Sequence, residues 1–499
     1  MNDSTALTSS FVREQQRYTL IELSNRLDCS IEETVHIIRK LKEFGILKTV
    51  SASDCQKELS ELTDDDITLT EVNADSDDCF FVFTFVGVAV VARHVLKCYP
   101  KYIKSIEKPF NELRQPLNNE LQQFLNNELR RILKVLEKYN SRNQIIRMFN
   151  ETSENSSFNL LAVQLFLIND YYENGIYSNT EDIVEINGSG EILWDKTINE
   201  TFALISDDTP YYTGLLTKKR TNNESDYFKR LHECILTRIS QEMRNADLLD
   251  LLEITEIDLT DQELDDFGET EYILYRIEQE LNTQFNTRKQ LVLKTIHSYI
   301  SNGGSLNDIN STSLFGTTSF NLVWEDVCSD ILNNQLHTPI AVLATPLKPV
   351  NHFYVSKKLL DIIEKPQWTI TGKEADKTLI PDLITISGDQ FLIFDAKYYT
   401  PVLSPGKKPQ GQPGIESVTK QYLYQQAYRQ FIIDHGLKQV KNCFLMPTEK
   451  SIVENMESVR MNMFASMGLQ DINVRYIPAS RAYELYLSGN KFDINELQL

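Results

Sequence analysis

The strongest constraint on the fold of this sequence is a pair of short apolar segments joined by a Gly-Asp turn. The first segment, 378–387, contains Asp382, and the second segment, 390–398, contains Asp395 and Lys397. A Gly-Asp pair between apolar segments is typical of a β-hairpin turn, and antiparallel pairing across it brings Asp382 near Asp395. Asp395 and Lys397 are two residues apart, so their side chains point to one face of the strand. The sequence therefore predicts a hairpin with two acids and a lysine gathered at one end.

This arrangement suits metal-assisted hydrolysis of a phosphodiester. Carboxylate oxygens are ligands that Mg²⁺ prefers, and Mn²⁺ is an alternative metal. A water bound to the metal becomes the nucleophile. Lys397 is predicted to orient or help deprotonate that water and to stabilise the anionic phosphate. Glu325, on a predicted helix at 320–332, is placed beside the same metal. The predicted catalytic residues are Asp382, Asp395, Lys397 and Glu325, and the predicted metal ligands are Asp382, Asp395 and Glu325. A hairpin with unrelated surface charges is the competing interpretation.

The segment after the hairpin is locally basic. From residue 401 to 450 there are seven basic and three acidic residues, although the whole chain has 50 basic and 71 acidic residues. A predicted helix at 417–435 presents Lys420, Gln421 and Tyr424 on one side. Basic side chains that neutralise phosphates dominate nucleic-acid affinity. These three residues are therefore predicted to bind DNA.

The N-terminal segment has the pattern of a helix-turn-helix. A helix at 18–27, a Ser-x-x-Glu capping box and a helix at 31–44 are followed by a glycine and an apolar strand. We predict a winged-helix-like domain over 1–52, with Arg39 and Lys40 as DNA contacts. Docking of a protein on the same surface is the alternative.

Changes in composition divide the rest of the chain. An acidic linker at 53–78 has ten acids against one lysine, and the Val- and Phe-rich strands at 79–103 follow it. After the linker we predict three domains. These are a small β domain for partner docking at 79–105, a helical middle domain at 106–310 with a β insert near 183–213, and a nuclease domain at 311–499. Within these parts we expect helices at 106–139, 157–174, 225–243 and 270–302, and strands at 438–446 and 472–477. Trp194 and Trp324 are expected in the core.

Composition excludes several other classes. A net charge of −21 argues against a chain that coats nucleic acid or anionic membrane over its whole surface. The seven cysteines include no CxxC pair, which argues against a zinc site and favours a reducing cytoplasm. The chain has no G-x-x-x-x-G-K-[ST] motif, so no nucleotide site of its own is expected. The N-terminus lacks a signal-peptide pattern and no membrane association is expected.

The order of these motifs resembles the PD-(D/E)XK nuclease superfamily. Within it, the chain looks like the LlaJI-type restriction endonucleases and, more distantly, the McrC nuclease subunits. The resemblance spans roughly residues 79 to 480 and is carried by Phe85-Val86-Gly87, Lys97 to Ile103, Gly190 to Asn199, Phe315-Gly316, Trp324-Glu325, Pro381-Asp382, Asp395-Ala396-Lys397 and Lys420-Gln421. McrC-like nucleases work with a separate ring-forming AAA+ NTPase, usually a GTPase, into which a strand-rich N-terminal domain inserts. The resemblance implies such a partner here, and assigns the insertion to about 79–105.

We therefore predict an α+β multidomain protein that ends in a restriction-endonuclease-like α/β domain. Its predicted function is a Mg²⁺-dependent DNA endonuclease, the cleavage subunit of an McrBC-like or LlaJI-like restriction system in phage defence. The predicted partners are double-stranded DNA, an McrB-type AAA+ GTPase or ATPase, and a cognate methyltransferase system. Two alternatives stay open: a repair or recombination nuclease of the same superfamily, and a non-catalytic DNA-binding regulator or adaptor.

Overall fold

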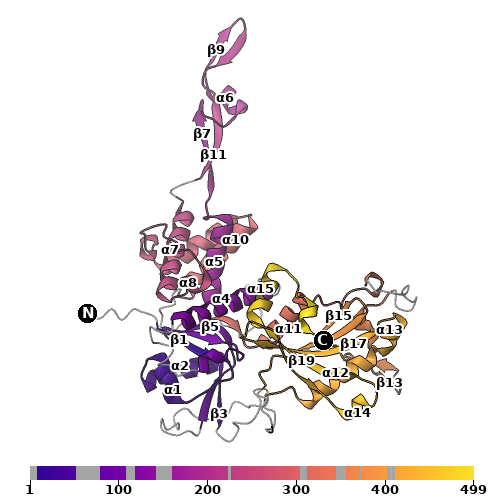
Figure 1. Cartoon of the computed structure of the whole chain (residues 1–499). Coiled ribbons are helices and arrows are strands. Elements are labelled where there is room, and N and C mark those ends of the chain that lie inside the picture. Colours follow the sequence, from indigo (N-terminus) through magenta and orange to yellow (C-terminus); the bar gives the residue numbers. More distant parts are fainter. Residues whose placement is uncertain are drawn as a thin grey trace. The chain divides into compact units, whose positions relative to one another are not determined.

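The chain folds into two compact units (Figure 1). One, the larger unit, combines the described residues of 8–156 with those of 315–499, and the other, the helical unit, comprises the described residues of 157–314. This computed structural model describes residues 8–51, 79–107, 119–141, 160–222, 226–303, 312–343, 356–370, 372–401, 406 and 411–499. The larger unit therefore joins the two ends of the sequence.

The predicted helix pair near the N-terminus is confirmed. Helices α1 (Leu20–Leu27) and α2 (Ile31–Glu43) each begin with a capping box, in which the cap side chain and the glutamate three residues later satisfy free backbone N–H groups. Tyr18 lies on strand β2 (Arg17–Tyr18) and not on the helix. Strand β4 (Cys79–Phe83) lies between β2 and β3 (Leu47–Ser51) in a three-stranded sheet. The acidic linker 53–78 lies outside the described residues.

The segment 79–105 is not a separate β domain, because its strands belong to two sheets shared with other segments. While β4 pairs with β2 and β3, strands β5 (Val86–Val91) and β6 (His94–Tyr99) lie between β1 (Thr8–Arg13) and β12 (Thr312–Thr317). All side chains of β5 are buried. We call residues 8–51 and 79–107 together the N-terminal module.

The C-terminal part of the larger unit is built on a five-stranded mixed sheet in the order β15-β16-β17-β19-β18. The predicted hairpin is formed by β15 (Leu383–Ser387) and β16 (Gln390–Ala396), which pair antiparallel. Strands β17 (Gln439–Thr448) and β19 (Ile472–Pro478) continue the sheet in parallel, and β18 (Glu454–Val459) closes it. The predicted helix at 417–435 is two helices, α12 (Ile415–Ala427) and α13 (Arg429–Asp434).

Helix α11 (Phe320–Ile331) packs against β16 and anchors the sheet to its neighbours. Its Trp324 is fully buried, as predicted, and its indole N–H donates to the Leu445 carbonyl at 3.1 Å. Helices α4 (Asn119–Ser141) and α15 (Ala479–Ser488) contact α11 and each other. A buried aromatic ring with a satisfied N–H is a strong packing anchor, so Trp324 holds α11, and with it Glu325, against the sheet.

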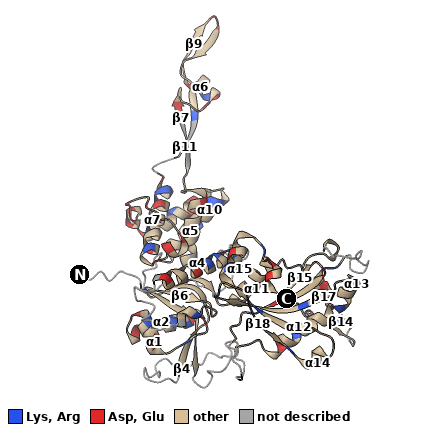
Figure 2. Ribbon diagram, in the orientation of Figure 1, with Lys and Arg blue, Asp and Glu red and all other residues tan. Residues whose placement is uncertain are grey.

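The helical unit contains α5 (Leu160–Asn174), α7 (Tyr227–Asn245), α8 (Leu249–Leu252), α9 (Thr270–Thr283) and α10 (Thr287–Ser301). The single helix predicted at 270–302 is wrong, because the Asn286 side chain caps a new helix by accepting from the Lys289 N–H. Acidic and basic residues are interspersed over these helices (Figure 2). None of the described helices is both long and apolar enough to cross a membrane.

An arm, residues 180–222, extends away from the helices of this unit (Figure 1). The first sheet of the arm has three strands, in which β11 (Leu216–Asn222) pairs antiparallel with both β7 (Thr180–Ile186) and β8 (Glu191–Ile192). The arm ends in the hairpin formed by β9 (Ala203–Ser206) and β10 (Thr209–Tyr212). Helix α6 (Trp194–Glu200) lies between β8 and β9 in the sequence. The predicted β insert is thus present, but Trp194 is 54% exposed and the core prediction for it is wrong.

The close approach of β5 and β12 leads to a stability prediction. A Cβ on Gly316 would lie 2.2 Å from the Val86 carbonyl oxygen and 2.4 Å from a ring atom of Phe85, so no side chain fits there without moving the backbone. Gly316→Ala is expected to destabilise the protein by about 1–3 kcal/mol, measured by urea unfolding. Gly414→Ala is the control, since none of the residues that the structure describes has an atom within 4 Å of a Cβ at that position. Equal stability of the two variants would contradict the packing described.

Candidate active site

The hairpin brings Asp382 and Asp395 together. Leu383 pairs with Phe394, so Asp382, just before β15, lies opposite Asp395 near the end of β16. The Ala396 backbone N–H donates to Asp382 Oδ2 at 2.9 Å, which ties the first acid to the strand that carries the second. Asp395 is buried, because apolar side chains precede it along β16 and α11 covers the strand. Both acids therefore lie at one end of the hairpin, as predicted from the Gly-Asp turn in the sequence.

The pair of acids is electrostatically costly as it stands. The pKa of Asp382 is raised, first by burial and then by the neighbouring Asp395, with which it shares a hydrogen bond. A buried carboxylate beside a second carboxylate favours the protonated form, because two like charges cannot both ionise cheaply at short range. A positive charge placed between the two acids would offset this cost.

Lys397 and Glu325 complete the cluster. Lys397 Nζ lies 3.0 Å from Asp395 Oδ2. Burial lowers the pKa of Lys397, but Asp395 and Asp382 outweigh that effect and the net direction is upward, which keeps the side chain an ammonium. The pKa of Glu325 is raised by burial and by Asp395, against the lowering effect of Lys397. All four residues predicted to be catalytic are thus brought together from three elements: α11, the start of β15 and the end of β16.

These donors suit a hard divalent cation. Asp382, Asp395 and Glu325 offer only carboxylate oxygens, the ligand type that Mg²⁺ prefers. The pKa of Asp382 is raised by burial and then by Asp395, an effect that a bound cation would oppose. Among the described residues, no three His, Cys, Asp or Glu side chains are already arranged around one point. The Lys397 ammonium lies against Asp395 instead.

A cavity of about 590 Å³ opens beside Lys397 and Glu325, and residues of the N-terminal module form its opposite wall. None of these residues is predicted from the sequence to belong to the site, since more than 200 positions separate them from the hairpin. Lys101 lies in the stretch from Lys97 to Ile103 that carries the family resemblance, but that stretch is predicted to dock a partner. The residues that line it are Glu14, Gln15, Gly45, Lys48, Thr84, Lys101, Thr318, Asn321, Glu325, Ala396, Lys397, Tyr398 and Tyr399.

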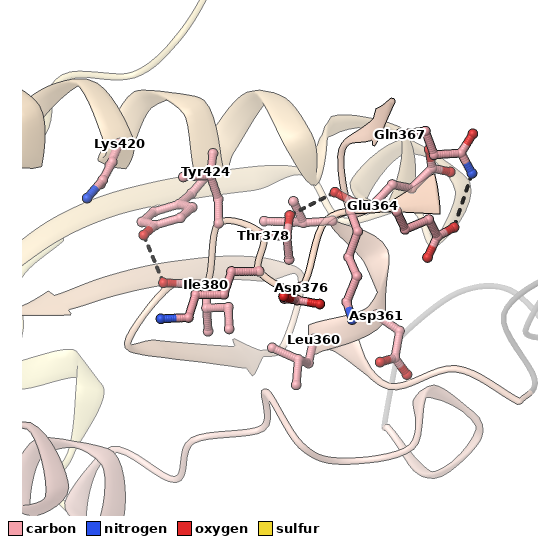
Figure 3. Close-up of a pocket in the computed structure, with 14 residues that line it drawn as sticks. Leu360, Asp361, Glu364, Gln367, Asp376, Thr378, Ile380, Lys420 and Tyr424 are labelled. Carbon is pink, nitrogen blue, oxygen red and sulfur yellow. Dashed lines mark hydrogen bonds between the residues drawn. The ribbon is translucent and has the colours of Figure 1, made fainter. Parts of the chain in front are cut away.

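The residues predicted on α12 lie elsewhere. A larger cavity of about 820 Å³ is lined by Lys420 and Tyr424 together with acidic residues such as Asp361 and Glu364 (Figure 3). Tyr424 is largely buried, and its hydroxyl donates to the Ile380 carbonyl at 2.8 Å, just ahead of the hairpin. Lys420 pairs with Glu416 at 2.5 Å and remains partly exposed. Figure 3 shows Lys420 and Tyr424 projecting from the same helix toward this cavity.

The prediction that Gln421 binds DNA is wrong. Its side chain is fully buried, and its Nε2 donates to the Ile393 carbonyl of β16 at 3.1 Å. A side chain facing the sheet from α12 cannot reach a nucleic acid outside it. Gln421 therefore contacts strand β16, and Tyr424 contacts the segment just before β15. On α2, Arg39 is exposed and Lys40 is partly buried, and neither lines the cavity beside Lys397.

Two acids and a lysine at the end of neighbouring strands of a mixed sheet are typical of nucleases that hydrolyse phosphodiesters with a metal ion. A family model described as LlaJI restriction endonuclease matches residues 85–479. The chain belongs to this family, which confirms the resemblance seen in the sequence. The match includes the whole hairpin and α11, and it begins after most of the N-terminal module.

A curated relative and two solved assemblies are similar to the chain. The relative is the type II restriction enzyme BsuMI component YdjA of Bacillus subtilis (strain 168), which is 28% identical over 436 residues covering 83% of each protein. A chain in an assembly of Thermococcus gammatolerans McrB AAA+ hexamers with bound McrC aligns with 97% of this chain and 99% of its own, at 10% identity and a TM-score of 0.36. A chain of the Thermococcus gammatolerans McrBC complex aligns with 59% of this chain and 80% of its own, at 13% identity and a TM-score of 0.23.

The raised pKa of Asp382 predicts a stability effect with a definite sign. A folded-state pKa above the ordinary 3.8 means that the native protein holds this proton more tightly than the unfolded chain does. Native stability is therefore lost as the pH rises from about 4 toward the raised pKa, by about 1.4 kcal/mol per unit of pH. Without divalent metal, Asp382→Asn is expected to be more stable than the native protein at pH 7, and this gain should vanish below pH 4.

The measurement is thermal or urea unfolding in EDTA at several pH values. Asp389→Asn, which changes an acid on the turn of the same hairpin, is the control and should show no such pH dependence. A gain for Asp382→Asn that persists unchanged below pH 4 would contradict the electrostatic explanation.

Proposed function

We propose that this chain is the Mg²⁺-dependent DNA endonuclease subunit of a restriction system, with Mn²⁺ as an alternative metal. The observation that carries the proposal is the cluster formed by Asp382, Asp395, Lys397 and Glu325. Membership in the LlaJI restriction endonuclease family supports the same conclusion. Duplex DNA is the proposed substrate, and hydrolysis of its phosphodiester backbone is the proposed reaction.

Each residue of the cluster has a distinct proposed task. Asp382, Asp395 and Glu325 would hold the metal, which supplies an activated water and offsets the charge on the phosphate. The backbone N–H of Ala396 keeps the Asp382 carboxylate oriented. Lys397, held as an ammonium beside Asp395, donates to a non-bridging phosphate oxygen and orients the attacking water. At neutral pH its raised pKa favours these tasks over deprotonation of the water.

We further propose that a separate AAA+ NTPase of the McrB type drives this nuclease. The sequence lacks a phosphate-binding loop of its own, so nucleotide hydrolysis has to come from another chain. The strands at 79–103, predicted to dock this partner, bury their apolar side chains inside two sheets and offer no exposed apolar tip. The proposed docking element is therefore the arm of the helical unit.

The arm has the chemistry of a docking element. Phe202 is 96% exposed and Ile205 is 76% exposed, and Leu204 lies between them on the same hairpin. Large apolar side chains at a projecting tip are the residues that anchor protein interfaces. The base of the arm is held by polar contacts within the unit: the Asn179 N–H donates to Asp226 at 2.7 Å, and Lys289 donates to the Ser178 carbonyl at 2.6 Å. A firm base and an apolar tip suit insertion into a partner.

Further partners follow from the sequence. Arg39 and Lys40 on α2 and Lys420 on α12 remain proposed DNA contacts, and a cognate methyltransferase system remains a proposed companion that protects host DNA. The cytoplasm is the proposed location.

The nuclease proposal predicts a separation between folding, binding and cleavage. Asp395→Ala is expected to lower cleavage of duplex DNA in Mg²⁺ by about 10²-fold or more, because it removes a metal ligand. Lys397→Ala is expected to retain DNA binding and to lose turnover to a similar extent. Cleavage is measured with the AAA+ partner and nucleotide present, and folding by thermal unfolding. Asp389→Ala is the control, and full activity of Asp395→Ala would overturn the site assignment.

The docking proposal predicts that the arm is dispensable for folding and required for coupling. The triple substitution Phe202→Ser, Leu204→Ser and Ile205→Ser is expected to abolish association with the AAA+ protein and to leave the unfolding midpoint unchanged. Partner-stimulated cleavage is expected to fall at least tenfold. The matched control is Phe285→Ser, which changes a 92% exposed aromatic residue elsewhere in the helical unit. Association that survives the triple substitution, or fast nucleotide-independent cutting by the isolated chain, would contradict the proposal.

A further inference from the structure

The N-terminal module contributes lysines to the cavity at the proposed nuclease site. Lys48 lies on β3 and Lys101 follows β6, and both line the same cavity as Lys397 and Glu325. All of these residues belong to the larger unit. The cavity therefore has two walls of different origin, one from the nuclease sheet and α11 and one from the module.

The Lys101 side chain is held in a defined position. Its Nζ donates to Gln15 Oε1 at 3.0 Å and lies 4.6 Å from the ring centroid of Tyr398 and 5.4 Å from that of Tyr399. These tyrosines directly follow Lys397 in the sequence. An ammonium stacked on aromatic rings is attracted to their faces, and holding a long side chain in advance lowers the entropy cost of binding an anion.

Buried hydrogen bonds connect the two walls of the cavity. The Tyr398 hydroxyl donates to the Glu14 carboxylate, and the Lys101 backbone N–H donates to the Tyr398 hydroxyl at 3.2 Å and to Glu14 at 3.3 Å. Both Glu14 and Tyr398 are largely buried, where such bonds are protected from competition by water. The spacing between Lys101 and Lys397 is thus set by contacts that do not depend on substrate.

The charges that line this cavity suit a phosphate-rich ligand. Its lining includes three lysines (Lys48, Lys101 and Lys397) and two glutamates (Glu14 and Glu325). Glu14 is engaged by Tyr398 and the Lys101 backbone, and Glu325 is one of the three proposed metal ligands. The lining thus has one more lysine than glutamate, in a chain with a net charge of −21. Lysines on both sides of a cleft attract the backbone of a nucleic acid.

We propose that Lys48 and Lys101 bind backbone phosphates of the DNA at the nuclease site, so that the N-terminal module forms the second wall of the substrate cleft. The inference rests on the proposed endonuclease function and extends it. The module would then hold DNA through its strand β3 and the turn after β6, at the active site itself, in addition to any contact made by α2. Its position next to Lys397 aligns the phosphate backbone with the metal ligands.

The test measures binding of a short fluorescent duplex to the full chain in Ca²⁺, over a series of salt concentrations. Lys48→Gln and Lys101→Gln are each expected to weaken binding about threefold or more and to lower the slope of log affinity against log salt by about one. Lys101→Arg keeps the positive charge and is expected to retain the native slope. Lys104→Gln, which removes an exposed lysine three residues from Lys101 and outside this cavity, is the control.

The outcomes separate this inference from the proposed function. A Lys48→Gln/Lys101→Gln protein that binds and cuts DNA like the native chain would overturn the inference and leave the endonuclease intact. Weaker binding with an unchanged salt slope would also overturn it, because it would indicate a structural role only. A native chain that neither binds nor cuts DNA with its partner and Mg²⁺ would overturn the proposed function itself. If Lys101→Gln lowers the unfolding midpoint, Lys48→Gln alone decides the outcome.

Discussion

The antiparallel register of β15 and β16 is the constraint on which the candidate site depends. Pairing of Leu383 with Phe394 places Asp382 opposite Asp395, and the Ala396 N–H holds the first acid in that position. A shift of one residue would turn one of the two acids to the other face of the sheet. Helix α12 contacts the hairpin at two points, because Gln421 donates to the Ile393 carbonyl of β16 and Tyr424 donates to the Ile380 carbonyl just before β15. Residues that looked like DNA contacts thus contact the hairpin that carries the acids.

Burial gives this small cluster its electrostatic character. Asp395 is nearly inaccessible, and the raised pKa values of Asp382 and Glu325 both have burial as their largest cause. In surroundings of low polarity a single ammonium or metal ion has a much larger effect than it has in water. Lys397 supplies one positive charge, and the acids favour a second. A bound cation at this candidate site would offset the repulsion between the two acids.

The two units distribute apolar surface in opposite ways. Strands β4 and β5 in the larger unit bury their Val and Phe side chains between neighbouring strands and helices, so this segment stabilises the fold. The arm of the helical unit exposes Phe202, Leu204 and Ile205 at a hairpin whose two strands pair, among the described residues, with each other alone. Exposed apolar residues concentrated at one tip favour a role in association. Composition alone could not distinguish these cases, because both segments are apolar.

The sequence by itself determined the features that depend on neighbouring residues: the two capping boxes before α1 and α2, the hairpin with Asp382 and Asp395, and the position of Asp395 and Lys397 on one face. Each follows from local hydrogen bonding or from the two-residue period of a strand. Tertiary structure decided what depends on distant segments. It divided 79–105 between two sheets, buried Gln421, exposed Trp194 and brought Glu14, Lys48 and Lys101 to the cavity beside Lys397. The physical reason is that burial and long-range pairing are properties of the packed chain, and no local pattern encodes which surface a given side chain will face.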